Sequence, residues 1–212
     1  MNSSTAETSI TTWLDALASG SPTPGGGAAA ALVGALGAAL VSMVARFTID
    51  RPKYAAVQDE VAGLLARGDA VRLTLLALVD ADAQAYGAVA QAYRLPRGDD
   101  GERTTRDVAI QAALIDATEV PLQIGAAAFE VAQLARMISQ IGNRSVLTDA
   151  GGAALLAEAA LHTALLNVNI NLAMLHDAVQ VTQFRERADT LTQGIHAIIT
   201  ETLEAIAVRH TA

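Results

Sequence analysis

The chain has 212 residues and a formal net charge of −8 at pH 7, from 14 Lys and Arg against 22 Asp and Glu. It is 52% hydrophobic, 3% aromatic and 17% charged, a composition typical of closely packed helices rather than of an aromatic-rich β-sandwich. The absence of cysteine excludes disulfides and thiolate chemistry, and the acidic balance argues against binding of nucleic acid.

The first half of the chain is predicted to contain three helices. A short amphipathic helix covers Ser9–Ala18, and the loop 19–27, SGSPTPGGG, follows it. A helix of small residues then runs to about Ile49. Arg51-Pro52 breaks the chain, and helical spacing of apolar residues predicts a long helix over Tyr54–Tyr93.

The second half follows a polar loop at residues 95–101 and is also predicted to be helical. Pro121 predicts a kink in the first of its helices, Thr148 is the expected N-cap of the second, and Asp149 lies in that helix's first turn. The predicted helices cover about 105–141, 148–181 and 184–208. No segment is typical of a strand. We therefore expect one all-α domain over residues 1–212, a bundle of long, partly kinked helices that is dimeric because such apolar helices need a partner surface.

One segment suggests a membrane protein as an alternative. Residues 27–45 carry no charge over about the length of a membrane span. Ala and Gly drive insertion weakly, however, and a helix that is apolar all round also fits a buried core. Because Met1–Thr12 contains neither a basic region nor an apolar run, we expect a cytoplasmic protein without a membrane partner.

The usual catalytic signatures are missing, and the four histidines lack metal-ligand spacing, so no metal site is predicted. Gly25, Gly26 and Gly27 open a helix, where free N–H groups can hold an anionic or polar group of a ligand. The glycines are explained equally well as a turn into a tightly packed helix.

Asp82 is the most informative acidic residue. On a helix it shares a stripe with Leu78 and Tyr86, whereas Asp80 lies about 200° away around the axis. Asp82 is therefore expected to face inward, where a carboxylate is costly unless it is paired or functional. The residues alone slightly favour an Asp bonded to a helix terminus or to an arginine.

Three further polar residues have two possible roles. Asn167 and Asn171 share one face of an apolar helix, where an interhelical hydrogen bond is favoured over contact with a bound heterocycle. Asp149 is explained most simply by the helix dipole, with ligand binding as the alternative.

Several of these segments occur together in one family. Residues 19–31, SGSPTPGGGAAAA, and 34–40, GALGAAL, resemble the signature of the cyclodeaminase/cyclohydrolase family, the C-terminal module of formiminotransferase-cyclodeaminase. The segment 79–86, VDADAQAY, resembles the acidic motif of that family. The sequence departs from the family pattern at Ala28, where Ser is usual, and in the glycine-rich pair Gly151-Gly152.

The resemblance implies an all-α homodimer that acts on one-carbon tetrahydrofolates. The second Asp of the acidic motif maps to Asp82, which is therefore the expected catalytic residue. No cofactor beyond the tetrahydrofolate substrate is expected. The residues expected to contact substrate are Ser21, Pro24, Gly25, Gly26, Gly27, Tyr86, Asp149, Asn167 and Asn171.

A single carboxylate beside the cationic 5,10-methenyl bridge of the tetrahydrofolate can serve either of two reactions. The first is hydrolysis of 5,10-methenyltetrahydrofolate to 10-formyltetrahydrofolate, and the second is ring closure of 5-formiminotetrahydrofolate with loss of ammonia. Because no formiminotransferase segment accompanies the domain, we expect the cyclohydrolase reaction, although a separate formiminotransferase partner would favour the second. A non-catalytic folate-binding protein is the alternative from another class, and the loop 97–105 is a candidate lid.

Overall fold

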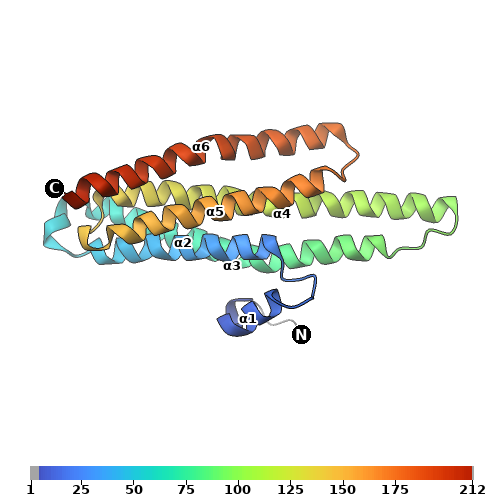
Figure 1. The fold of residues 1–212 in the computed structure, drawn as a ribbon, viewed down its shortest axis with the longest axis horizontal. Helices are drawn as coiled ribbons and strands as arrows, with labels where there is room; N and C mark the ends of the chain where they lie inside the picture. Colours follow the sequence, from blue (N-terminus) through green and yellow to red (C-terminus); the bar gives the residue numbers. More distant parts are fainter. Residues whose placement is uncertain (1–4, 212) are drawn as a thin grey trace.

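The structure is a computed structural model that describes residues 5–211, and across that range it is helical, with no strand. The all-α prediction is therefore confirmed. Figure 1 shows the long helices running side by side in an elongated bundle, with a short N-terminal helix on one flank. The elements are η1 (Thr5–Glu7), α1 (Ile10–Leu17), α2 (Gly26–Thr48), η2 (Pro52–Val57), α3 (Gln58–Tyr93), α4 (Asp100–Ile141), η3 (Arg144–Val146), α5 (Leu147–Leu172) and α6 (Ala178–Thr211).

Small residues allow α2 to lie at the centre of the bundle. A Cβ atom added at Gly37 would lie 3.1 Å from the carbonyl oxygen of Ala153 on α5, and one added at Gly68 of α3 would lie 2.8 Å from Ser42 Oγ. The backbones of α3 and α5 thus approach α2 more closely than larger side chains permit. This close packing explains why α2 is built almost entirely from Ala, Gly, Val and Leu.

Both α2 and residues 144–172 are long and apolar enough to span a bilayer by length and composition alone. More than half of the apolar window in α2 is buried within the bundle, against 44% for the second segment. Burial in the core therefore accounts for the composition of α2, while part of α5 keeps an apolar surface.

Two predicted helix starts differ from those in the structure. α4 begins at Asp100, earlier than predicted, because Asp99 Oδ1 accepts the N–H of Glu102 at 2.8 Å. The prediction that Thr148 caps the third long helix is wrong, since α5 begins at Leu147 and Val146 is its N-cap residue without a side-chain bond. Asp149 does lie in the first turn of α5.

The boundary between the last two helices also differs from the prediction. α5 ends at Leu172, well before Val181, and α6 begins at Ala178 rather than near Phe184. The cause is Asp177, whose Oδ1 accepts the N–H groups of Val179 and Gln180 and so starts a new helix.

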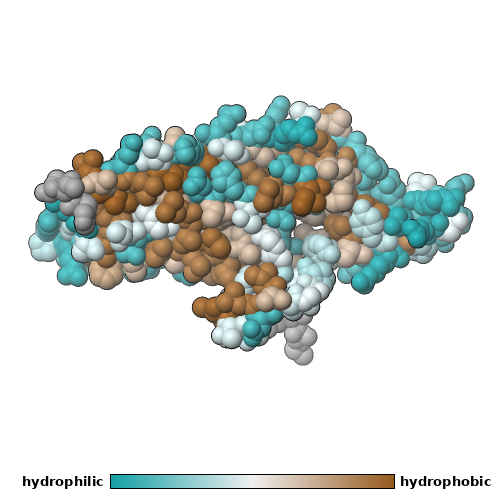
Figure 2. Space-filling view, in the orientation of Figure 1, coloured by the Kyte–Doolittle hydropathy of each residue, from teal (hydrophilic) through white to brown (hydrophobic). Residues whose placement is uncertain are grey.

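The end of α3 and the start of α4 extend beyond α5 and α6 (Figure 1), and residues 83–109, which include this overhang, are called the two-helix arm here. All of these residues are described, and Ala92 is the one buried residue among them. Figure 2 shows that the end of the arm is mainly hydrophilic. Pro121 lies further along α4, inside the bundle, and the helix continues past it to Ile141.

Candidate functional site

The start of α2 leaves backbone donors free. Gly25 is the N-cap residue and has no side chain to bond them, and the first intrahelical bond runs from Ala29 N–H to the Gly25 carbonyl at 2.9 Å. The N–H groups of Gly26, Gly27 and Ala28 therefore need partners outside the helix. Asp82 of α3 supplies one, since its Oδ2 accepts the N–H of Ala28 at 2.9 Å.

Gly27 and Asp82 lie so close together that a larger residue at position 27 would have to displace the Asp82 carboxylate. A Cβ atom added at Gly27 would overlap Asp82 Oδ1 and lie 2.6 Å from its Cγ. Asn167 of α5 lies on the neighbouring side, because a Cβ atom at Gly26 would be 3.7 Å from its Nδ2. Three helices, α2, α3 and α5, thus meet at the triple-glycine start of α2.

The electrostatics of Asp82 are those of a carboxylate without a counter-ion. Burial raises its pKa above the ordinary value, and the hydrogen bond from Ala28 opposes this only in part. Within residues 5–211 no cation pairs with Asp82 and no donor bonds its Oδ1. Such a group can stabilise a neighbouring cation, and its free oxygen can hold a proton.

The other carboxylate of the acidic motif faces elsewhere, as its position on the helix predicts. Asp80 Oδ1 accepts from both the backbone N–H of Thr5, at 3.1 Å, and its hydroxyl, at 2.6 Å. Asp80 therefore holds the N-terminal segment against α3. The two aspartates are two residues apart in sequence but bind different parts of the chain.

Among the other predicted residues, those near the start of α2 lie closest to Asp82. Pro24 is half-buried directly before the glycines, whereas Ser21 is exposed in the loop and donates its N–H to Ser19 Oγ at 3.1 Å. Tyr86 lies one turn beyond Asp82 on α3 and is 48% exposed. Its ring is therefore free to contact a ligand above the carboxylate.

Asn167 and Asn171 have different surroundings. Asn167 donates to the Thr163 carbonyl of its own helix at 3.0 Å, which leaves its Oδ1 without a donor in the described part of the chain. Asn171 donates to the Ala117 carbonyl of α4 at 2.6 Å, which is the interhelical bond favoured by the residues alone.

Asp149 is not brought together with the rest of the predicted site. It precedes Asn167 by 18 residues on α5, which corresponds to about 27 Å along a helix that rises 1.5 Å per residue. Within one chain, Asp149 and Asp82 therefore lie near opposite ends of the bundle.

The backbone N–H of Ala28 was not among the site groups predicted from the sequence, where Ala28 appears only as a departure from the usual Ser. The position was open to prediction, because Ala28 is the third residue of a helix whose cap lacks a side chain, and the N–H at that position commonly needs an external acceptor. Helix periodicity could not show that the acceptor is Asp82, since the two residues are 54 positions apart.

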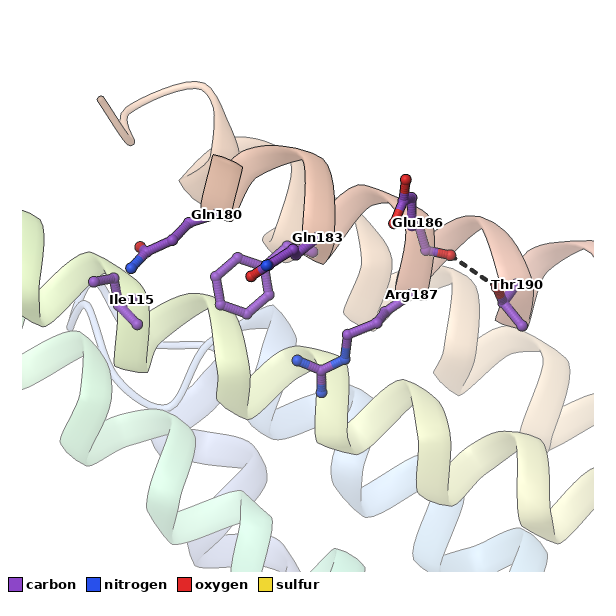
Figure 3. A pocket seen from close by; sticks show the side chains of 7 residues that line it. Ile115, Gln180, Gln183, Glu186, Arg187 and Thr190 are labelled. Carbon is purple, nitrogen blue, oxygen red and sulfur yellow. Dashed lines mark hydrogen bonds between the residues drawn. The ribbon is translucent and has the colours of Figure 1, made fainter. Parts of the chain in front are cut away.

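A separate pocket of about 500 Å³ lies between α4 and α6 and contains none of the predicted site residues. Figure 3 shows Gln180, Gln183 and Arg187 projecting from α6 toward α4. Arg187 forms two hydrogen bonds with Glu119, at 2.7 and 2.8 Å, so its charge is already compensated. The pocket therefore offers no uncompensated charge from Arg187, in contrast to the carboxylate of Asp82.

Comparisons with known proteins agree on one family. A sequence model described as Formiminotransferase-cyclodeaminase matches residues 9–190. A methenyltetrahydrofolate cyclohydrolase from Methylorubrum extorquens is 46% identical over 168 residues, covering 79% of this chain and 81% of that protein. The formimidoyltransferase-cyclodeaminase of Rattus norvegicus is 36% identical over 188 residues, which are 87% of this chain but 35% of the rat protein.

The fold agrees as well. The crystal structure of a formiminotetrahydrofolate cyclodeaminase from Thermotoga maritima superposes with a TM-score of 0.86 at 28% identity, covering 95% of this chain and 97% of that one. The matched region includes the triple glycine, Asp82 and Asn167. The chain therefore belongs to the formiminotransferase-cyclodeaminase family.

Proposed function

We propose that this protein is a methenyltetrahydrofolate cyclohydrolase in which Asp82 is the catalytic residue. The observation that carries the proposal is the half-buried carboxylate without a counter-ion at the triple-glycine start of α2. The 46% identity to a cyclohydrolase that has a similar length supports this choice of reaction. The substrate's 5,10-methenyl bridge is a cation spread over two nitrogens and one carbon, which such a carboxylate complements.

The hydrolysis needs one group that accepts a proton and then returns it. Water adds to the bridge carbon, and Asp82 Oδ1 takes a proton from it to give a neutral carbinolamine. Asp82 then protonates N5 as the bond between N5 and the bridge carbon breaks. The formyl oxygen loses its proton to solvent, so that one cation and one water give 10-formyltetrahydrofolate and one proton.

The pKa of Asp82 suits this exchange. Burial raises the pKa of this carboxyl and makes it a better proton acceptor than an exposed aspartate, while the Ala28 N–H keeps Oδ2 fixed. Binding of a cationic substrate lowers the pKa again, so the carboxylate is ionised when water attacks. The apolar surroundings therefore serve both the charge stabilisation and the proton transfer.

The same surroundings suggest how the substrate binds. Gly25 and Gly26 leave the backbone open to a flat ring, and Asn167 Oδ1 is positioned to accept an N–H of a pterin. Tyr86 offers its exposed ring one turn along α3. We place Ser21 and Pro24 at the outer edge of the site and assign Asn171 the structural role that its bond to Ala117 indicates.

Formiminotetrahydrofolate cyclodeaminase is the second candidate, and the superposition on the Thermotoga maritima enzyme favours it. Both reactions pass through the same methenyl cation, so the two candidates share Asp82. The deciding experiment offers the purified protein 5,10-methenyl- and 5-formiminotetrahydrofolate separately. Loss of the methenyl chromophore supports the hydrolase, whereas ammonia release with formation of that chromophore supports the deaminase.

A folate-binding protein without activity is distinguished by the same preparation. Calorimetric binding of 5-formyltetrahydrofolate, a stable analogue, with no turnover of either substrate would contradict the catalytic proposal. Binding accompanied by turnover of one substrate supports it and identifies the reaction.

We further propose that the protein acts as a cytoplasmic homodimer. Exposed leucine and isoleucine side chains follow α2 and α5, and Figure 2 shows hydrophobic residues gathered over the left and centre of the face where these helices lie. The most exposed are Leu36 (52%), Leu155 (49%), Leu166 (65%) and Ile170 (63%). A second copy of the chain would bury this surface by twofold symmetry. Light scattering tests this: Leu166→Glu should yield monomers, while a monomeric wild-type protein would contradict the proposal.

A further inference from the structure

A second polar pocket lies at the opposite end of the bundle from Asp82. Its volume is about 440 Å³, and residues 51–54 and 143–145 line it. Asn143 donates its N–H to Thr48 Oγ1 at 2.8 Å, which places the pocket at the C-terminal end of α2. Thr48 follows Ala28 by 20 residues, which corresponds to about 30 Å along the helix. The pocket is therefore separate from the Asp82 site within one chain.

Hydrogen bonds between three segments hold the base of this pocket in place. Asn143 Nδ2 donates to the Phe47 carbonyl at 2.8 Å, and the N–H of Arg144 donates to the Tyr54 hydroxyl at 3.1 Å. The Tyr54 hydroxyl in turn donates to Asn143 Oδ1 at 3.4 Å. These bonds join the end of α2, η2 and the start of η3, so the side chains around the pocket project from a fixed backbone.

The charges around the pocket are all positive. Arg51, Lys53 and Arg144 line it, and none of them has a carboxylate within 4.0 Å in the described part of the chain. Elsewhere in the bundle Arg46 and Arg136 are paired with Asp69 and Glu201. The lining therefore carries three positive charges that no ion pair in the described residues compensates, in a protein of net charge −8.

A fourth cation, Arg209, lies near Arg144. Arg209 donates to the carbonyls of Ser139 and Gly142, at the end of α4 just before Asn143. Burial and the neighbouring charge of Arg144 lower the pKa of Arg209, so the two guanidinium groups repel each other. A bound anion would relieve that repulsion.

We propose that this pocket binds a small anion with two or more negative charges. Two guanidinium groups and an ammonium group supply donors that match carboxylate or phosphate oxygens, and arginine can bind either through two parallel bonds. The volume lies within the range of about 300–1,000 Å³ for small-molecule sites, larger than one simple ion needs. The ligand is therefore either a chain of carboxylates or a phosphorylated small molecule. This inference does not depend on the proposed cyclohydrolase activity.

The test measures binding of two probes, tetra-γ-glutamate and inorganic pyrophosphate, by calorimetry at low salt. The double variant Arg51→Gln/Arg144→Gln removes two cations from the pocket. The control, Arg97→Gln/Arg185→Gln, changes the net charge equally at two exposed arginines outside it. The wild type and the control should bind at least one probe with one site per chain, and the pocket variant should bind it at least about tenfold more weakly.

The two probes distinguish the two sources of negative charge. Saturable binding of tetra-γ-glutamate alone identifies a carboxylate chain, and binding of pyrophosphate alone identifies a phosphorylated ligand. Failure of the wild type to bind either probe would overturn the inference, and so would an equal loss of affinity in the control variant. Because all four substituted arginines are exposed, circular dichroism should show unchanged folding.

Discussion

The bundle and the arm are built from the same two helices but are stabilised differently. Within the bundle, α3 and α4 bury side chains such as Leu75 and Leu114 completely. Within the arm, residues 83–109, almost all side chains keep contact with solvent, and Val108 is 64% exposed. One continuous helix can therefore pass from a region held by hydrophobic burial to one held mainly by its own hydrogen bonds and by contacts with its neighbour.

Asp82 lies at the boundary between these two regions. α2 begins there, so the bundle supplies a fixed N–H donor from Ala28 and a close approach from Gly27. The arm begins at the next residue, and Tyr86 in its first turn is 48% exposed. The site thus combines a fixed backbone from the bundle with an exposed aromatic ring from the arm.

The largest expected effect comes from removing the charge at this boundary. Asp82→Asn keeps an oxygen that can accept from Ala28 but can neither take a proton nor stabilise a cation. Turnover of 5,10-methenyltetrahydrofolate should fall by about 10²–10⁴-fold, while circular dichroism shows an unchanged helical fold. Near-normal turnover in this variant would contradict the role proposed for Asp82.

A pair of substitutions on one helix compares the bundle with the arm directly. Leu114→Ala leaves a cavity in the bundle and should lower the free energy of unfolding by about 2–5 kcal/mol. Val108→Ala, six residues earlier on α4 and in the arm, should change it by no more than about 0.5 kcal/mol. Urea unfolding measures both, and equal losses would show that the arm is as tightly packed as the bundle.

Two helical glycines, one at the site and one away from it, test the close approach at the start of α2. Gly27→Ala places a methyl group against the Asp82 carboxylate and should displace it, with a loss of turnover of about tenfold or more from misplaced geometry. Gly63→Ala, on an exposed face of α3 away from the site, meets no atom within 4 Å and is the control. The control should retain activity and gain up to about 1 kcal/mol of helix stability. Equal activity in the two variants would argue against the observed position of Asp82.

The pH dependence should show a smaller effect with a defined sign. Because burial raises the pKa of Asp82, kcat/KM should fall on the acid side at a pH above the ordinary aspartate value of about 3.9. Below the ordinary aspartate pKa, the raised pKa of Asp82 stabilises the folded state. This contribution is lost as the pH rises through the pKa that Asp82 has in the folded protein. At neutral pH, Asp82→Asn should therefore unfold at the same or a slightly higher temperature than the wild type. A clear decrease would show that the ionised form is stabilising.

The sequence by itself determined the helices and the inward direction of Asp82. Both follow from local rules, because a period of 3.6 residues fixes which side chains share a face of α3, and Pro and Gly limit where helices can run. The triple glycine was also recognisable as the start of a helix of small residues. Short-range geometry therefore carried most of the fold and the orientation of Asp82, whereas its catalytic role was proposed from the family resemblance.

Tertiary structure decided which groups meet. The bond from Ala28 to Asp82, the bond from Asn171 to Ala117 and the separation of Asp149 from Asp82 depend on residues far apart in sequence. Periodicity along one helix predicts the direction in which each side chain points, but it does not predict which neighbouring residue the side chain contacts. That neighbour is fixed when small residues let α2, α3 and α5 pack at close range, since only this packing sets the relative position of the helices along their axes.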